Sequence, residues 1–277
     1  MSDPLPAPEL GKRPRRLNDA HTHVGMAKDA PPGSEAAALV QAMDDLGVAR
    51  AAVITPSTVN GDNSATFDAV AAFPARFVAI ALVDWSGPDP TGALATAADA
   101  GARGIRFNLV SEAAAEAVLE TKLEQFWRVF VNRGTVAVFH AFPRQLPVVA
   151  QLALRHPELT ILVDHLGRPD VTTGPDSADF AALLGLSGAP NVSVKTPNSS
   201  FFSRAPAPHV DLVPFLEATL KEFGATRLLW GSDWPVCTQE EPYPAATSSI
   251  DLALAAASDA EREAVFADNF DRIFGHN

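Results

Sequence analysis

The chain has 277 residues, 47% hydrophobic and 19% charged, which is enough apolar material for one large core. Its formal net charge is −12, and phosphate binding needs clustered Lys and Arg, so the composition argues against a nucleic-acid partner. No apolar run approaches the ~20 residues of a membrane span, and the start of the chain lacks a secretory signal. The single Cys237 excludes an intrachain disulfide and fits a reducing compartment. We therefore expect a cytoplasmic protein with a small-molecule partner; the composition leaves its oligomeric state open.

Strand-like apolar runs alternate with Ala-rich segments of helical spacing along the chain. Several of the helical segments end at a glycine that can cap a helix, namely Gly47, Gly101, Gly134 and Gly224. Ser34 and Asp259 are predicted N-caps, neither in a capping box. The predicted strands are 16–20, 51–55, 77–83, 104–107, 135–139, 160–163, 192–195 and 227–230. The predicted helices are 34–46, 64–73, 90–100, 119–133, 145–156, 177–186, 210–223, 245–256 and 259–274.

Eight strand-then-helix units predict an α/β fold, a single-domain (β/α)8 TIM barrel over residues 16–277. Residues 1–15 are Pro-rich and polar, and we expect a flexible tail there. A doubly wound open sheet is the alternative architecture. The glycine fingerprint of its dinucleotide-binding form, G-x-G-x-x-G, does not follow the first strand, and so the barrel is preferred.

Polar side chains follow the predicted strands, where a barrel of this kind places its chemistry. Four of the seven histidines stand at strand exits, and the other three, His156, His209 and His276, are interpreted as structural or exposed. The residues at strand exits are Asp19, His21, His23, Asp84, Arg106, Asn108, His140, Asp164, His165, Arg168, Lys195, Arg204, Ser232 and Asp233.

The strongest candidates lie after the first and last strands. Alternate residues of a strand point to the same side, so His21 and His23 should project together and either bind a metal or polarise a substrate carbonyl. Asp233 stands between Gly231-Ser232 and Trp234-Pro235 in the sequence. Its carboxylate can act as a general base for water or as a metal ligand. Asp19 either fixes a histidine tautomer or is a plain strand-edge carboxylate.

Four motifs carry a resemblance to the amidohydrolase superfamily: DAHTH at 19–23, RGIRFN at 103–108, VDHLGRPD at 163–170 and LLWGSDWP at 228–235. They resemble most the amidohydrolase-2 branch, which holds 2-pyrone-4,6-dicarboxylate hydrolase and the sugar lactonases. The resemblance implies a barrel that hydrolyses a cyclic ester. It matches His21, His23, His165 and Asp233 to the family's catalytic residues, and Arg106 and Arg168, with Asn108 beside them, to its substrate-binding positions. Arg204 is a looser third match.

Two departures from the pattern bear on substrate and cofactor. Ser111-Glu112 stands where the pyrone hydrolase carries a further basic residue, which argues against the pyrone dicarboxylate itself. His140 at the fifth strand brings the site closer to metal-binding members. The predicted ligands of one zinc or manganese ion are therefore His21, His23, His140 and Asp233, and a metal-independent reaction stays open because the branch contains both kinds.

Three functions compete on these residues. A lactonase would activate water with Asp233 and polarise the carbonyl with His21, His23 and His165. A decarboxylase of a small aromatic or unsaturated acid would need a firmly bound metal, and Asp19 in the first-strand motif does not decide that point. A non-enzymatic binding protein has no evident use for the complete set of histidines with Asp233. The lactonase is the prediction, with the decarboxylase as its alternative.

Overall fold

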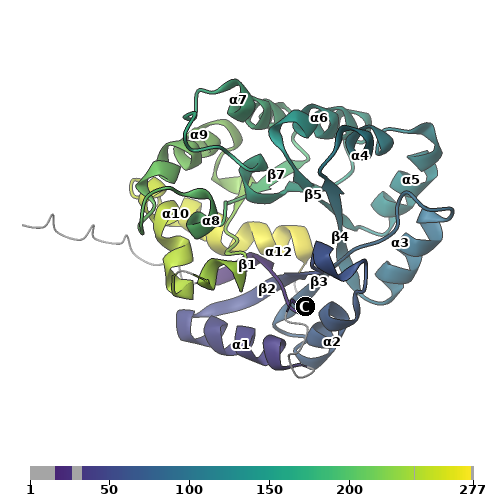
Figure 1. The fold of residues 1–277 in the computed structure, drawn as a ribbon, viewed down its shortest axis with the longest axis horizontal. Coiled ribbons are helices and arrows are strands. Elements are labelled where there is room, and N and C mark those ends of the chain that lie inside the picture. Colours follow the sequence, from purple (N-terminus) through teal and green to yellow (C-terminus); the bar gives the residue numbers. More distant parts are fainter. Residues whose placement is uncertain (1–15, 27–32, 240, 276–277) are drawn as a thin grey trace, which may run out of the picture.

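The computed structural model describes residues 16–26, 33–239 and 241–275 (Figure 1). The tail expected at 1–15 and His276 lie outside these ranges. The strands form one parallel sheet in the order β1 to β8, which confirms the predicted barrel over the open sheet. The strands are β1 (Leu17–Thr22), β2 (Val48–Ile54), β3 (Phe77–Ala81), β4 (Ala102–Leu109), β5 (Val136–Ala141), β6 (Ile161–Val163), β7 (Val192–Lys195) and β8 (Leu228–Leu229).

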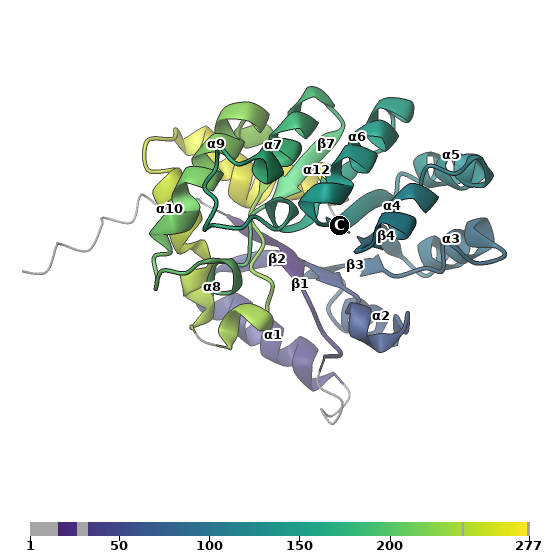
Figure 2. The ribbon, with the colours of Figure 1, turned by 45° about the horizontal axis from the view of Figure 1, so that its top comes forward.

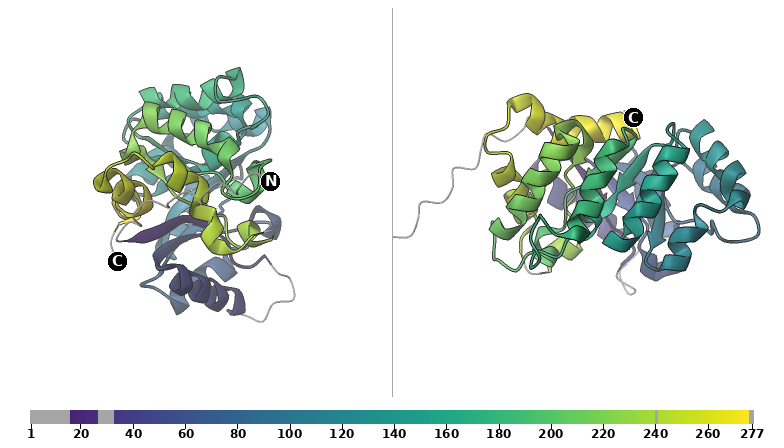
Figure 3. Two further views of the ribbon diagram at one scale, coloured as in Figure 1. Left: turned by 90° about the vertical axis from the view of Figure 1, so that its left-hand side faces the viewer. Right: turned by 90° about the horizontal axis from the view of Figure 1, so that it is seen from above.

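Helices surround the strands in all views (Figure 2, Figure 3). No helix among the described residues is long and apolar enough to cross a bilayer. The helices are α1 (Ser34–Leu46), α2 (Ser64–Ala72), α3 (Pro90–Asp99), α4 (Glu112–Ala117), α5 (Glu124–Asn132), α6 (Leu146–Arg155), α7 (Ala178–Leu184), α8 (Ser199–Phe202), α9 (Val213–Phe223), α10 (Ser248–Ala253), α11 (Asp259–Glu263) and α12 (Asn269–Phe274).

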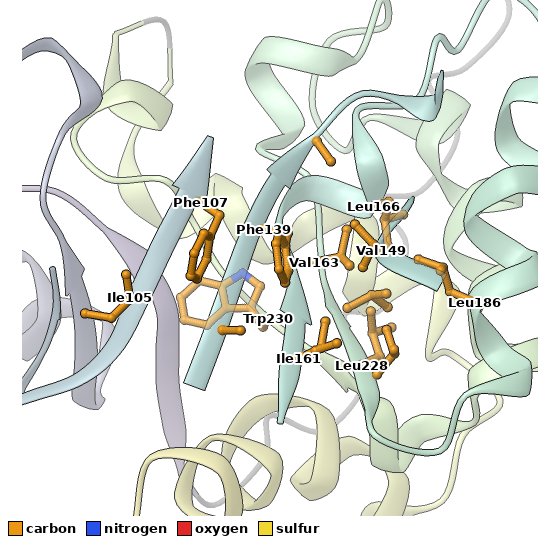
Figure 4. Packing of buried hydrophobic residues seen from close by; sticks show 14 of the residues in the cluster. Ile105, Phe107, Phe139, Val149, Ile161, Val163, Leu166, Leu186, Leu228 and Trp230 are labelled. Atoms are coloured by element: carbon orange, nitrogen blue, oxygen red, sulfur yellow. The ribbon is translucent and has the colours of Figure 1, made fainter. Parts of the chain in front are cut away.

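Two hydrophobic layers follow from the alternation of side chains along the strands. One cluster takes Ala52 and Ile54 of β2 with matching residues of the other strands, and Phe270 and Phe274 of α12 join it. We assign this cluster to the barrel interior. The other cluster packs the opposite strand faces against the surrounding helices. Figure 4 shows part of it, including Phe107 and Phe139 of neighbouring strands. The interior cluster gives way to polar residues at the carboxyl ends of the strands, where the candidate site lies.

The barrel closes beside the DAHTH motif. The backbone N–H of Ala20 donates to the carbonyl of Trp230 at 2.9 Å, and the N–H of Asp233 donates to the carbonyl of His21 at 2.8 Å. Gly231 is required at this seam because a Cβ there would lie 2.9 Å from the Cβ of His21. The closure therefore holds the first and last motifs directly against each other.

A register shift in β1 orients the histidines. Between Asp19 and Thr22, β1 spans one residue more than its partner Ala51–Val53 in β2. Such a bulge switches the side-chain alternation. Ala20 packs in the interior cluster, and yet its neighbour His21 also reaches an interior residue, Asp164, from the same strand. The simple alternation used in the prediction misses this bulge, although it correctly pairs His21 with His23.

Several element ends differ from the prediction. The N-cap of α11 is Ser258, in a capping box with Glu261, so the prediction of Asp259 without a capping box was wrong by one residue. Gly33 precedes α1 in the position expected for Ser34. The predicted helix 259–274 is interrupted by a π-helical turn (Ala264–Asp268), and α4 and α8 were not predicted.

Candidate active site

His21, His23 and Asp233 meet at the carboxyl end of the barrel. The Nε2 atoms of the two buried histidines lie 3.2 Å apart. Oδ1 of Asp233 lies 3.7 Å from Nε2 of His21 and 3.2 Å from Nε2 of His23. Among the described residues, these three form the group of potential ligands whose donor atoms all lie within 4.8 Å of one another.

The partners of the other ring nitrogens decide what this group can hold. Nδ1 of His23 lies 2.7 Å from the carbonyl oxygen of Ile54, so it carries the proton and donates it. Nδ1 of His21 faces Oδ1 of Asp164 at 3.4 Å. Both histidines therefore direct an Nε2 lone pair toward the Asp233 carboxylate. Converging electron pairs repel unless a proton or a cation lies between them, so this nitrogen and oxygen donor set fits a divalent metal such as zinc.

The turn after β8 fixes the Asp233 carboxylate. Asp233 has a left-handed backbone with φ 67°, and Nδ2 of the buried Asn198 donates to its Oδ2 at 3.0 Å. Burial opposes ionisation of Asp233, but its interactions with His23, His165 and His21 outweigh that effect and hold the pKa well below its ordinary value. Asp233 is therefore a carboxylate at neutral pH.

His165 faces Asp233 from the turn after β6. Its backbone is left-handed with φ 52°, and its Nε2 lies 4.0 Å from Oδ2 of Asp233. The His165 ring centroid is 4.3 Å from that of His21. Burial is the main cause that lowers the pKa of both rings, and they are neutral at neutral pH.

A buried ion pair lies behind His21. Nζ of Lys195 lies 2.9 Å from Oδ1 of Asp164, and both side chains are fully buried. Nε of Arg106 lies 3.6 Å from the other oxygen of Asp164. Burial alone would raise the pKa of Asp164, but Lys195, His21 and Arg106 hold it well below its ordinary value. Lys195 thus pairs with a charged residue at the end of the barrel.

Asp19 joins β1 to the Asp233 turn rather than holding a histidine ring. Its carboxylate accepts hydrogen bonds from the backbone N–H of His21 at 3.0 Å and from that of Ser232 at 2.9 Å. It also accepts from the Ser232 hydroxyl at 2.5 Å and the Tyr243 hydroxyl at 2.7 Å. Burial nevertheless raises the pKa of Asp19 above its ordinary value. The imidazole tautomers are set by Ile54 and Asp164 instead.

Arg106, which contacts Asp164, and Asn108 line a cavity of about 380 Å³. Both are on β4, two residues apart, and so face the same side. The Oδ1 of Asn108 is buried with no protein partner, leaving an acceptor available to a ligand. The other lining residues are Asn60, Gly61, Leu82, Val83, Asp84 and Trp85.

Arg168 and His140 contact each other outside the set of residues that line this cavity. Nη1 of Arg168 lies 2.9 Å from Nε2 of His140. Burial, followed by the charge of Arg106, lowers the pKa of His140 to about 3, so His140 is neutral and accepts this hydrogen bond. His140 is not in the three-residue metal group, and its Nε2 contacts Arg168. Arg204 lies on an exposed loop, where its backbone N–H donates to Asp211 at 2.7 Å, and a role in the pocket stays a prediction.

Two contributors were absent from the sequence-based set. Asn198 orients Asp233 and also caps α8, and an Asn three residues before a Phe pair is a weak signal for such a cap. Tyr243 reaches Asp19 across 224 positions of the sequence, and no local pattern indicates that contact.

The chain matches known proteins along most of its length. The model of a family described as amidohydrolase matches residues 18–275. A 4-sulfomuconolactone hydrolase of Hydrogenophaga intermedia is 32% identical over 90% of this chain and 82% of its own. A 2-pyrone-4,6-dicarboxylate hydrolase of Comamonas testosteroni is 31% identical over 81% and 78% of the two chains. An L-fucono-1,5-lactonase of Burkholderia ambifaria is 31% identical over 69% and 66%.

Solved structures share the fold at lower identity. An amidohydrolase from Burkholderia multivorans with bound zinc has a TM-score of 0.80 at 21% identity, covering 95% of this chain and 100% of its own. A 2,6-dihydroxybenzoate decarboxylase from Rhizobium has a TM-score of 0.63 at 18% identity, covering 95% and 99%. At these identities the likeness extends to the barrel alone.

Proposed function

This chain belongs to the amidohydrolase family, and from that premise we propose that it hydrolyses a lactone of a small carboxylated or sugar-acid type. The relatives that cover most of the chain are lactone hydrolases, whereas the decarboxylase is similar in fold only. The observation that carries the proposal is the convergence of ionised Asp233 with His21 and His23 at the mouth of the barrel.

In the proposed reaction Asp233 is the general base. It accepts a proton from water as the water oxygen bonds to the lactone carbonyl carbon. Asn198 donates a hydrogen bond to one carboxylate oxygen of Asp233. This bond fixes the orientation in which the carboxylate meets that water. When the tetrahedral intermediate collapses, the ring C–O bond breaks and Asp233 returns the proton to the departing alkoxide oxygen. Water and lactone thus become one hydroxy acid, and Asp233 is regenerated.

The histidines stabilise the charge that forms on the carbonyl oxygen. His165 donates a hydrogen bond from its neutral ring, and His21 and His23 polarise the oxygen from the facing side. A divalent metal on His21, His23 and Asp233 would supply Lewis-acid polarisation and a more acidic water at the same place.

Arg106 and Arg168 recognise the anionic group of the substrate in this proposal. Guanidinium groups bind carboxylates through paired hydrogen bonds. Arg106 is nearly buried at the wall of the cavity, where Asn108 adds an unpartnered acceptor for a substrate donor. Arg204 is retained as a third contact for a substrate that extends to the exposed loop.

The test is a panel of lactones with two simultaneous readouts. Purified protein is incubated with carboxylated, hydroxylated and neutral lactones while acid release is titrated at constant pH and carbon dioxide is measured in the headspace. We expect acid release without carbon dioxide. Carbon dioxide released from an aromatic or unsaturated acid, with no lactone opened, would establish the decarboxylase instead.

We also propose that the enzyme works in the cytoplasm on a free small molecule, without nucleic-acid or membrane partners. The single cysteine, Cys237, and the net charge of −12 support this setting. Fractionation of the source cells tests this proposal. Activity in a membrane or secreted fraction would contradict it.

A further inference from the structure

Three phenylalanine rings surround the Arg168 guanidinium. Its Cζ lies 4.8 Å from the ring centroid of Phe142, 5.6 Å from that of Phe201 and 5.3 Å from that of Phe202. We call these rings, Phe142, Phe201 and Phe202, the aromatic wall. Within the described residues Arg168 forms no ion pair with a carboxylate, and its polar neighbour is the neutral His140. The cation is therefore available to an anion that enters from the mouth of the barrel.

The aromatic wall is exposed to that mouth. Phe201 is 58% exposed and Phe142 is 36% exposed, although large apolar side chains are normally buried. Their exposure leaves apolar surface next to a cation, which suits a ligand with an anionic group on an apolar body.

Phe202 connects Arg168 to the reacting centre. Its ring centroid lies 5.8 Å from that of His165, and the same ring lies under Arg168. A small substrate whose anion reaches Arg168 and whose carbonyl reaches His165 must place its body against Phe202. The ring of the lactone is therefore the part of the substrate that the aromatic wall contacts.

Two of the three rings of the aromatic wall, Phe201 and Phe202, are held in place on α8. Asn198, the N-cap of α8, accepts from the backbone N–H of Phe201 and donates to Asp233. The Ser199 hydroxyl lies 2.8 Å from the Ser249 hydroxyl of α10, beside which α8 lies (Figure 2). Anchored rings have less freedom to lose when a substrate binds, and such preorganisation favours a defined ligand shape.

These contacts lead to an inference that rests on the proposed lactonase function and narrows its substrate. We propose that Phe142, Phe201 and Phe202 select a lactone whose ring is flat, unsaturated and free of hydroxyl groups, with its anionic substituent on Arg168. Phenylalanine offers no hydrogen-bond partner, and a hydroxyl buried against it loses its water without replacement. A sugar-acid lactone carries several such hydroxyls on the face that would meet the aromatic wall.

The experiment compares two lactones of equal charge. One is 4-carboxymethylbut-2-en-4-olide, unsaturated and without hydroxyls, and the other is D-glucaro-1,4-lactone, which carries both a carboxylate and hydroxyls. We expect kcat/KM to favour the first on the order of tenfold to hundredfold, the range over which an apolar pocket rejects an added hydroxyl. A preference for the glucarolactone would overturn the inference and leave the lactonase function standing. Turnover of neither lactone, nor of any other in the panel, would contradict both.

Variants of the aromatic wall test which rings cause the preference between the two lactones. Phe201→Asn and Phe142→Asn change exposed side chains and should fold, and each should reduce the ratio of the two kcat/KM values toward one. Phe202→Leu keeps an apolar contact and should retain most of the preference, whereas Phe202→Asn should lose it. Leu154→Asn, a matched change at a 72% exposed position on α6, should leave the ratio unaltered. An unchanged ratio in Phe201→Asn and Phe142→Asn would show that the aromatic wall does not select the substrate.

Discussion

Replacement of Lys195 by methionine should destabilise the barrel strongly, because it leaves the Asp164 carboxylate buried without its main partner. The two charges are 2.9 Å apart in a fully buried position. At an effective dielectric constant of ~20 their attraction is about 6 kcal/mol. The variant no longer buries the ammonium, which offsets part of that loss, and breaking a buried pair typically costs about 3–5 kcal/mol. We expect Lys195→Met to lose that amount of unfolding free energy at pH 7.

Urea unfolding provides the measurement, with Lys122→Met as its matched control. Lys122 also forms a 2.8 Å ion pair, with Glu120, but it is 60% exposed, and its replacement should change stability by less than about 0.5 kcal/mol. Because Lys195 is the largest cause that lowers the pKa of Asp164, its removal raises that pKa. The deficit of Lys195→Met should therefore shrink as the pH falls and Asp164 takes up a proton. Equal losses of unfolding free energy in the two variants would contradict the stabilising role of the buried Lys195–Asp164 pair.

Three further outcomes test the site. Arg106→Met should raise KM for a carboxylated lactone far more than for a neutral one, and equal increases would remove its role in anion binding. A chelator should lower lactone turnover only partly, with metal content measured in the same samples; complete loss restored by one divalent ion would make the metal essential. Burial holds the pKa of His21 and His165 below their ordinary 6.5 and that of His140 at about 3. These rings therefore bind protons in the unfolded chain before the folded one as pH falls below about 6.5, and stability should drop by up to about 1.4 kcal/mol per pH unit for each. Identical urea midpoints at pH 7 and pH 5.5 would contradict this.

The barrel could be predicted because its information is local. Apolar strand-like runs followed by segments of helical spacing mark each unit, and the helix predicted at 34–46 has the same bounds as α1. The DAHTH motif and Asp233 could be assigned to one site because parallel strands present their carboxyl ends together. Nothing in that reasoning needs the register of the strands.

Contacts that depend on register were beyond such reasoning. The extra residue in β1 turns His21 toward Asp164, and only the pairing with β2 reveals it. His140 lies near the carboxyl end of β5, yet the left-handed turn at Arg168 brings a guanidinium onto its Nε2. His140, a predicted metal ligand, thus contacts Arg168, a predicted substrate-binding residue. The backbone conformation that brings them together is not specified by composition.

The hydrolysis rate of the Asp233→Asn variant tests the central claim most directly. Asparagine keeps the size of the side chain and can still contact Asn198, but it cannot accept a proton from water. The assay follows acid release from the lactone that the wild-type protein opens fastest, at neutral pH where Asp233 is ionised, with urea unfolding to show that the variant is folded. Loss of a general base lowers kcat by about 10²–10⁴-fold, and we expect a loss of at least that size. A folded variant with near-native kcat would contradict the assignment of Asp233 as the base.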